Sequence, residues 1–229
     1  MAYIADELKN AMVTTGKPTQ MGGLPHELGS TGYGVALCTK VAVEFKGESL
    51  NGKTVAIEGY GNVGTFAHQF LEEWGAKVVA ASDSKGTVYN PEGLKHAELM
   101  KTKEEQGTVT AHQGEKKEGR DLFELDVDIL VPGARPDVIT QENVESIKAK
   151  YVSEAANLPA KYEVEQVLMK KGVIVLPDFV ANAGGVISSY CETMGWSADT
   201  MLKVVTDKIA ANKKVMMERA QEDNDTRKA

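Results

Sequence analysis

The stretch Thr54–Gly75, TVAIEGYGNVGTFAHQFLEEWG, decides the fold. An apolar, β-like run ends at Glu58, glycines follow at Gly59, Gly61 and Gly64, and apolar residues then recur at helical spacing. The spacing G-x-G-x-x-G alone also occurs in ordinary turns of α/β proteins that bind no nucleotide. A strand, a glycine turn and a helix in this order favour a dinucleotide site, where free amides at a helix N-terminus meet a pyrophosphate.

Each glycine has a separate predicted role in that turn. Gly59 makes the tight turn, Gly61 lets the phosphates come close, and Gly64 lets the helix pack against the strand. The predicted cofactor contacts include the whole turn: Gly59, Tyr60, Gly61, Asn62, Val63 and Gly64.

The nucleotide preference depends on the end of the next strand-like run. Asp83 lies there, nineteen residues after Gly64 (83 − 64), and a carboxylate at this place accepts hydrogen bonds from the adenine ribose. Asp83 therefore favours NAD, whereas Ser84 and Lys85 beside it could receive the extra phosphate of NADP. We expect NAD or NADP, with a preference for NAD.

Strand-like and helical patterns alternate along the 229 residues. The strand-like runs are nearly continuous in apolar character, as in parallel strands covered on both faces. They are Thr54–Glu58, Lys77–Ser82, Asp128–Val131, Tyr151–Ser153 and Val173–Leu176, with a weaker candidate at Thr108–Ala111. Helical patterns occur at Tyr3–Met12, from Ser30 or Thr31 onward, and at Thr65–Trp74, Glu92–Gln106, Gln141–Ala149, Tyr162–Lys171 and beyond Gly184.

The alternation predicts an α/β fold with a doubly wound, mostly parallel sheet, a Rossmann-type dinucleotide-binding domain with flanking N- and C-terminal helices. We expect one domain over residues 1–229. It comprises a helical lead-in and loop at 1–50, a Rossmann core at 51–183 and C-terminal helices at 184–229. The polar tail EDNDTRKA is predicted to fray.

Composition excludes several classes of protein. The 33 acidic residues outnumber the 26 Lys and Arg, which argues against a nucleic-acid binder. The N-terminus lacks the pattern of a signal peptide, and no apolar run approaches the ~20 residues of a membrane span. Cys38 and Cys191 lie in apolar helical patterns typical of buried, reduced thiols. The histidines are scattered, so we expect no metal, no membrane contact and a cytoplasmic location.

Four ordered stretches accompany the glycines: TGKPTQMGG…LGSTGYGV (Thr15–Val35), VPGA (Val131–Ala134), SEAANLP (Ser153–Pro159) and PDFVANAGGVISSYCE (Pro177–Glu192). Together they resemble the nucleotide-binding domain of the glutamate/leucine/phenylalanine/valine dehydrogenases, most closely that of the glutamate dehydrogenases. The resemblance covers nearly the whole chain. It implies oxidative deamination of an amino acid, which for glutamate yields 2-oxoglutarate and ammonia.

The resemblance also implies contacts for single residues. Thr31 resembles the nicotinamide-side contact, with a helix N-cap as its alternative or additional role. Asn62 would contact the phosphate–ribose region, or serve only as a turn residue. Ala134 matches the small residue beside the adenosine-side ribose.

Two carboxamides and a serine complete the implied site. Asn157 and Asn182 can donate and accept at once, which suits a nicotinamide amide or its ribose, although Asn182 could also be a turn residue before Gly184. Ser189 resembles the family's contact to the substrate carboxylate. The sequence departs from the family pattern at AKYE after Pro159 and at Tyr33, where some members have Arg. These departures leave open how the cofactor is held and which substrate is bound.

The family's acid–base groups are absent from these 229 residues. In the family a lysine and an aspartate belong to a glycine-rich Lys motif and a Pro-Asp motif of a preceding substrate domain, and Lys17 matches a later stretch. We therefore expect no catalytic residue here, an isolated or truncated domain that binds dinucleotide without turnover, and a monomer or weak dimer from a homo-oligomeric parent. The alternatives are a free-standing nucleotide-responsive binding module that acts through a partner, or the same domain of a leucine, phenylalanine or valine dehydrogenase.

Overall fold

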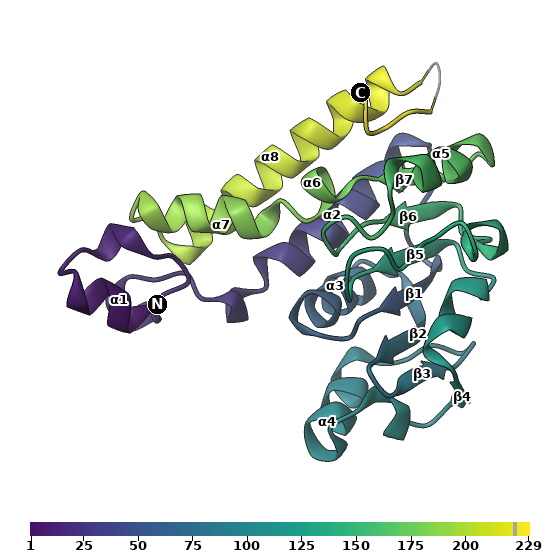
Figure 1. Ribbon diagram of the computed structural model, residues 1–229, viewed down its shortest axis with the longest axis horizontal. Helices are drawn as coiled ribbons and strands as arrows, with labels where there is room; N and C mark the ends of the chain where they lie inside the picture. The colour runs from purple at the N-terminus through teal and green to yellow at the C-terminus, as the bar shows by residue number, and fades with distance from the viewer. Residues whose placement is uncertain (222–223) are drawn as a thin grey trace.

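A sheet of seven strands forms the body of the molecule, from which an arm with α1 (Ala2–Glu7) and α7 (Gly184–Thr193) projects (Figure 1). The structure, a computed structural model, describes residues 1–221 and 224–229. The strands are β1 (Thr54–Glu58), β2 (Lys77–Asp83), β3 (Gly86–Tyr89), β4 (Glu115–Lys117), β5 (Ile129–Pro132), β6 (Tyr151–Ser153) and β7 (Ile174–Leu176). Their order across the sheet is β4-β3-β2-β1-β5-β6-β7.

The sheet is mostly parallel, as predicted. β2, β1, β5, β6 and β7 run parallel, whereas β3 is antiparallel to β2 and β4 is antiparallel to β3. The chain winds outward from β1 in one direction to β2 and later in the other direction to β5. The crevice at this topological switch point is where ligands bind in open α/β sheets. The predicted α/β fold is confirmed.

Helices cover both faces of the sheet. On one face α2 (Ser30–Phe45), α3 (Asn62–Glu73) and α8 (Ala198–Arg219) share an apolar core with β1 and β5. On the other face α5 (Tyr162–Lys170) packs with the 3₁₀ turns η5 (Gly119–Glu124) and η6 (Val144–Ser146). The remaining helical elements are α1 (Ala2–Glu7), α4 (His96–Gln106), α6 (Asp178–Ala181), α7 (Gly184–Thr193), and the 3₁₀ turns η1 (Ala11–Val13), η2 (Thr19–Met21), η3 (His26–Leu28) and η4 (Val109–Ala111).

Four helix and strand predictions were wrong. The helix predicted at Tyr3–Met12 ends at Glu7, and only the 3₁₀ turn η1 follows it. The predicted strand Thr108–Ala111 is η4, and the predicted helix Gln141–Ala149 contains only η6. At the start of the latter, the Asn143 side chain accepts from the Thr140 amide at 2.8 Å and donates to the Val138 carbonyl at 2.9 Å. Such local bonds compete with helix formation. The helix predicted from Glu92 begins only at His96, because Gly93 has a φ of +105°.

The strands β3 and β4 were not predicted. Each is short, and β4 reads EKK, without the apolar run that marks the other strands. They form the antiparallel edge of the sheet, and α4 packs beside them through Leu99.

The prediction of a frayed tail was wrong for residues 224–229. The hydroxyl of Thr226 donates to the Val175 carbonyl at 2.7 Å, and the Asn224 side chain donates to the Val173 carbonyl at 3.1 Å. Thr226 is buried. The tail therefore folds back onto the end of the sheet that carries β7; the predicted fraying of residues 222 and 223 lies outside the described residues.

No helix within residues 1–221 and 224–229 combines the length and the apolar character that a membrane span requires.

Candidate cofactor-binding site

The glycine turn at the end of β1 is closed at two positions and open at the third. A Cβ on Gly59, whose φ is +88°, would lie 2.6 Å from the Ala134 amide nitrogen, and a Cβ on Gly64 would lie 2.2 Å from the Gly59 carbonyl oxygen. A Cβ on Gly61 would meet no atom of the described chain within 4 Å. Gly59 and Gly64 therefore serve the packing of the protein, whereas Gly61 borders free space.

The first turn of α3 presents its main-chain amides at this open position. Gly61 is the residue before α3 and has no side chain to cap the helix. The first amides of a helix have no acceptor within it and lie at its positive end. The turn itself is held against β2, because the Tyr60 amide donates to the Ser82 carbonyl at 2.7 Å. These are the features of an anion site.

The side chain of Tyr60 belongs to the core and not to the cofactor surface. It is buried, and its hydroxyl lies 2.7 Å from Nδ1 of His68, whose Nε2 lies 3.0 Å from the Leu94 carbonyl oxygen. Since a carbonyl can only accept, His68 carries its proton on Nε2, and Nδ1 accepts from Tyr60. Burial lowers the pKa of His68 to about 4, so the ring is neutral. Tyr60 was predicted to contact the cofactor. Because its side chain is buried, only its main chain can face a ligand.

A hollow of about 490 Å³ opens beside the turn. Lys103 of α4 reaches into this region and donates to the Tyr60 carbonyl, with its ammonium 5.6 Å from the centre of the Tyr60 ring. The Asn62 side chain donates to the His26 carbonyl at 3.2 Å, so it ties α3 to η3. The lining residues are Glu27, Tyr60, Gly61, Asn62, Thr65, Phe66, Met100, Lys103 and Glu104. Val63, the remaining residue of the predicted turn, packs against the core.

Glu58 holds the main chain at Ala134, the residue predicted to lie beside the adenosine ribose, and this role was missed by the sequence analysis. This residue ends β1 and is buried, and its Oε2 accepts from the amides of Gly133 and Ala134 at 3.0 and 2.9 Å. Burial raises the pKa of the Glu58 carboxyl, and the two amide bonds oppose that rise. Glu58 thus fixes Ala134 beside Gly59. The sequence feature that could have identified Glu58 is an acidic residue at the end of an apolar strand.

Asp83 makes contacts that its predicted role did not include. Its Oδ1 accepts from the Lys85 amide at 2.9 Å, and its Oδ2 accepts from the Val109 amide at 2.8 Å. The hydroxyl of Thr108 adds a bond of 3.1 Å to Oδ1. The carboxylate therefore anchors η4. Oδ1 already accepts two hydrogen bonds, whereas Oδ2 accepts one and keeps a further acceptor position. Ser84 follows in the exposed turn between β2 and β3.

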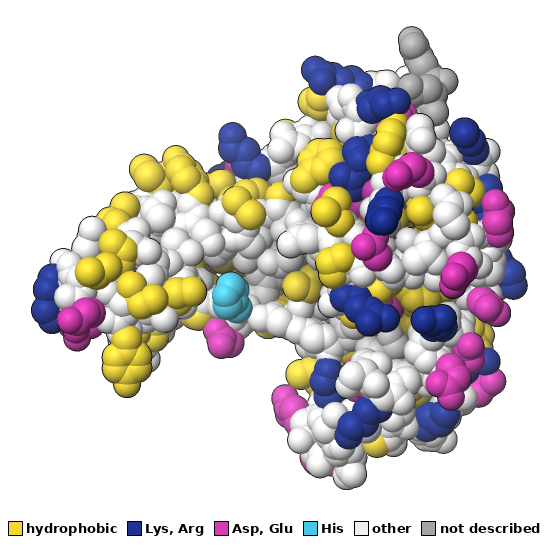
Figure 2. All heavy atoms as spheres, viewed as in Figure 1, with side chains coloured by type: hydrophobic (Ala, Val, Ile, Leu, Met, Phe, Trp, Pro, Cys, Tyr) yellow, Lys and Arg dark blue, Asp and Glu magenta, His cyan; other side chains and the backbone are white. Residues whose placement is uncertain are grey.

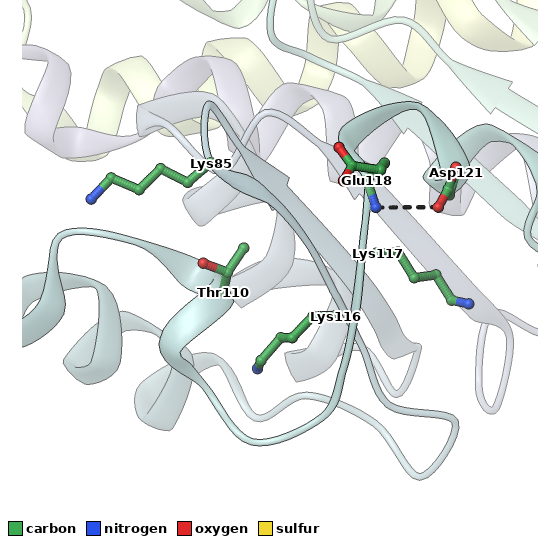
Figure 3. A pocket seen from close by; sticks show the side chains of 6 residues that line it. All are labelled: Lys85, Thr110, Lys116, Lys117, Glu118 and Asp121. Carbon is green, nitrogen blue, oxygen red and sulfur yellow. Dashed lines mark hydrogen bonds between the residues drawn. The ribbon is translucent and has the colours of Figure 1, made fainter.

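A second hollow of about 460 Å³ lies at the β3–β4 edge (Figure 3). In Figure 3 the side chains of Lys85 and Lys117 point in opposite directions, and the Glu118 amide donates to the Asp121 carboxylate at 3.2 Å. The lining residues are Lys85, Thr110, Lys116, Lys117, Glu118 and Asp121. Because the lysines do not converge and two acids stand among them, this hollow is not a built phosphate site.

The N-terminus of α2 meets that of α7 at the predicted nicotinamide side. A Cβ on Gly184 would lie 2.0 Å from the Ser30 carbonyl oxygen, and one on Gly185 would lie 2.6 Å from Oγ1 of Thr31. Thr31 lies within the first turn of α2 and does not cap it, because Gly29, with a φ of +68°, precedes the helix. The N-cap interpretation of Thr31 was wrong.

The two predicted carboxamides lie together. Nδ2 of Asn182, at the end of α6, donates to Oδ1 of Asn157 at 2.7 Å, and it lies 3.4 Å from the Ala155 carbonyl oxygen. Asn157 follows β6 and Asn182 follows β7. Since parallel strands end at the same edge, these residues share that edge with the glycine turn and with Ala134. Figure 2 shows the surface indented between the arm that carries α1 and α7 and the body that holds the sheet.

The loop that contains Lys17 is held by α7 through buried charge. Glu192 accepts from the amides of Gly16 and Leu24, each at 2.8 Å, and pairs with the ammonium of Lys17. Lys17 and Glu192 are both buried. One turn earlier on α7, the predicted substrate contact Ser189 accepts from the Thr15 hydroxyl at 3.3 Å. The sequence feature that could have indicated this buried pair is the acidic residue at position 192, which lies beside the apolar face of a helical pattern.

No group of three or more His, Cys, Asp or Glu side chains in the described ranges could hold a metal ion. Cys38 and Cys191 are buried and free, as predicted.

The family model of the glutamate/leucine/phenylalanine/valine dehydrogenases matches residues 22–229. The chain belongs to this family. Its sequence is 50% identical over 212 residues to a glutamate dehydrogenase of Aeropyrum pernix, covering 90% of this chain and 51% of that protein. It is 47% identical over 182 residues to a glutamate dehydrogenase of Thermotoga maritima, covering 79% of this chain and 44% of that protein.

A solved structure agrees with these matches. The hetero-hexameric glutamate dehydrogenase from Thermus thermophilus, in its Leu-bound form, superposes with a TM-score of 0.89 at 28% identity. The superposition covers 99% of this chain and 56% of that chain. The predicted resemblance and fold are thereby confirmed. The chain spans about half the length of the relatives it matches.

Proposed function

We propose that this chain is the NAD(P)-binding part of a glutamate dehydrogenase, an enzyme that converts glutamate to 2-oxoglutarate and ammonia. The observation that carries the proposal is the open position at Gly61, between two glycines whose missing side chains are needed for packing. A turn built only for packing would have no reason to leave the middle glycine bare. When bound, the nicotinamide cofactor accepts the hydride of the reaction.

The residues fit a dinucleotide laid along the carboxyl edge of the sheet. The amides of Asn62, Val63 and Gly64 at the start of α3 would hold the pyrophosphate. Ala134, Asp83 and Ser84 would form the adenosine side; Asp83 favours the unphosphorylated ribose of NAD. Thr31, Asn157 and Asn182 would form the nicotinamide side, and Ser189 would contact the substrate carboxylate.

We expect the 229-residue chain to bind dinucleotide without deaminating glutamate. Lys17 lies in the loop that contacts Ser189 through Thr15, and its ammonium is buried against Glu192. It is thus unsuited to proton transfer with a substrate. The amino acid would be bound only together with the further half that the relatives possess.

Calorimetric titration of the chain with NAD and with NADP tests the proposal, alongside an assay for glutamate-dependent NADH formation. Gly61→Val should keep the fold, because the φ of Gly61 is −92° and its surroundings are open. It should lower dinucleotide affinity by about thirtyfold, because it displaces the pyrophosphate from several amides. Gly119→Val is the matched control, since Gly119 is also open and lies on η5.

An unchanged affinity in Gly61→Val would refute the proposed site, and turnover of glutamate by the pure chain would refute the expected inactivity. We further expect a monomer or weak dimer, measurable by sedimentation. Exposed apolar side chains on α1 and α7, among them Tyr3 and Val186, would favour association.

A further inference from the structure

Three acidic side chains that are distant in sequence surround a single arginine of the tail. Arg227 Nη2 lies 3.0 Å from Glu154, 2.6 Å from Glu165 and 3.0 Å from Asp178. Its Nε donates to the second oxygen of Glu165 at 2.6 Å, so that pair is bidentate. The side chains of Glu154 and Glu165 are fully buried. Without the guanidinium, up to three negative charges would share one desolvated space.

Two of these acids hold the main chain beside the paired carboxamides. Oε2 of Glu154 accepts from the Asp178 amide at 3.0 Å, and Oδ2 of Asp178 accepts from the Leu158 amide at 2.9 Å. Leu158 directly follows Asn157 and has a φ of +49°, a backbone conformation that residues other than glycine rarely adopt. The Asp178 bond therefore fixes a strained turn whose neighbour carries one carboxamide.

Asp178 also begins the helix that ends at the other carboxamide. α6 runs over Asp178–Ala181, and the Asn182 amide donates to the Asp178 carbonyl at 2.8 Å. One residue on, Phe179 places its ring 5.3 Å from the guanidinium carbon of Arg227. The position of Asn157 and that of Asn182 thus both depend on Asp178, and the charge of Asp178 is balanced by Arg227.

We propose that Arg227 is a positioning residue for the nicotinamide side of the site, acting through Asp178 on Asn157 and Asn182. This inference rests on the proposed dinucleotide binding. It predicts an effect on one end of the ligand only, because the hydrogen bonds of the described residues do not join the main chain of the Gly59–Gly64 turn to the carboxylate cluster.

The test compares NADH with ADP-ribose, which lacks the nicotinamide ring, by calorimetry on the full 229-residue chain. In Arg227→Met, affinity for NADH should fall about tenfold, as expected for the loss of one good hydrogen bond, while affinity for ADP-ribose stays within about twofold. Lys228→Met is the matched control. It removes the same charge from the same tail, but its ammonium pairs with Asp225 at 3.1 Å, away from the cluster.

Asp178→Ala is the second variant, for the case that Arg227→Met does not fold. It cuts the link to Leu158 while Arg227 keeps Glu154 and Glu165, and it should produce the same selective loss. Equal losses for both ligands in the folded variant, or no loss, would overturn the inference and leave the proposed function standing. If the unaltered chain binds neither ligand, the proposed function fails and the inference fails with it.

Discussion

The two sides of the candidate site are built in different ways. At the glycine turn the groups proposed to face the ligand are main-chain amides, and a Cβ on Gly61 would meet only open space. At the opposite side the groups proposed to face the ligand are side chains, and ion pairs lie beside them: Lys17 with Glu192, and Arg227 with Glu154, Glu165 and Asp178.

The two sides differ in how far apart in sequence the residues that build them lie. The amides of the turn are placed by residues adjacent in sequence, namely a strand, three glycines and a helix start, although Ser82 and Ala134 pack against the turn from elsewhere. The other half joins the lead-in loop, β6, β7, α7 and the tail. Its links are hydrogen bonds between distant residues, and those made by Lys17 and Arg227 are charged. Its stability should therefore respond to charge changes, whereas the turn should respond to added volume.

The largest expected effect follows from removing the buried ammonium on the charged side. Lys17→Met leaves Glu192 buried and unpaired, and it should lower the free energy of unfolding by about 4 kcal/mol, or the melting temperature by about 10 °C. Lys9→Met is the control: its pair with Asp6 is exposed at 79% and 72%, so thermal unfolding should barely change. Similar melting of both variants would contradict a role for buried charge.

Adding a methyl group should affect stability differently at two glycines of the turn. Gly64→Ala places a methyl group 2.2 Å from a main-chain oxygen that cannot move away, and it should cost about 3 kcal/mol of stability. Gly61→Ala adds the same methyl group in open space and should cost less than about 0.5 kcal/mol. Chemical denaturation measures both, and an equal cost would remove the distinction between the two positions.

Acid should weaken the core beneath the turn through His68. Its pKa is about 4 in the folded chain and about 6.5 when unfolded, so the unfolded state binds the proton first as the pH falls. This contribution to stability is complete above about pH 7.5 and decreases by about 2 kcal/mol at pH 5. Denaturation curves of His68→Gln at the two pH values should lack that part of the change; an identical pH dependence would assign it to other groups.

The smallest expected effect concerns nucleotide preference. Asp83→Asn removes a negative charge from the place where NADP would carry its phosphate, so the ratio of NADP to NAD affinity should rise about fivefold. Asp126→Asn is the control, because Asp126 is exposed and lies outside the site. Calorimetry with both nucleotides gives the ratio, and a constant ratio would mean that Asp83 serves only to anchor η4.

Prediction from sequence succeeded for elements whose own residues show a pattern typical of a strand or a helix. The strands that became β1, β2, β5, β6 and β7 were found because each is a nearly continuous apolar run, and the helix α3 because its apolar residues recur along one face. It failed at β4, whose residues are polar, and at 141–149, where the Asn143 side chain replaces helical bonds. β4 exists because β3 pairs with it, and the local bonds of Asn143 do not alter the apolar spacing from which the helix was predicted.

The same limit applies to the candidate site. The roles of Glu58, Glu192 and Arg227 were missed, since a buried acid and an exposed one look alike until their partners are known. The assignment of Tyr60 changed for the same reason: its ring packs on a histidine eight residues away instead of facing the ligand. The predicted domain limits and site roles remain predictions that the binding experiments can test.

The amino-acid sequence by itself determined the five parallel strands, the doubly wound α/β class, the glycine turn and the family. These depend on backbone conformation and on apolar periodicity, which neighbouring residues encode. Only the tertiary structure decided that the tail docks beside β7 and that its arginine joins three acids around the carboxamides. A charge recognises its partner by proximity in space, and proximity between residues 154, 178 and 227 arises only when the chain has folded.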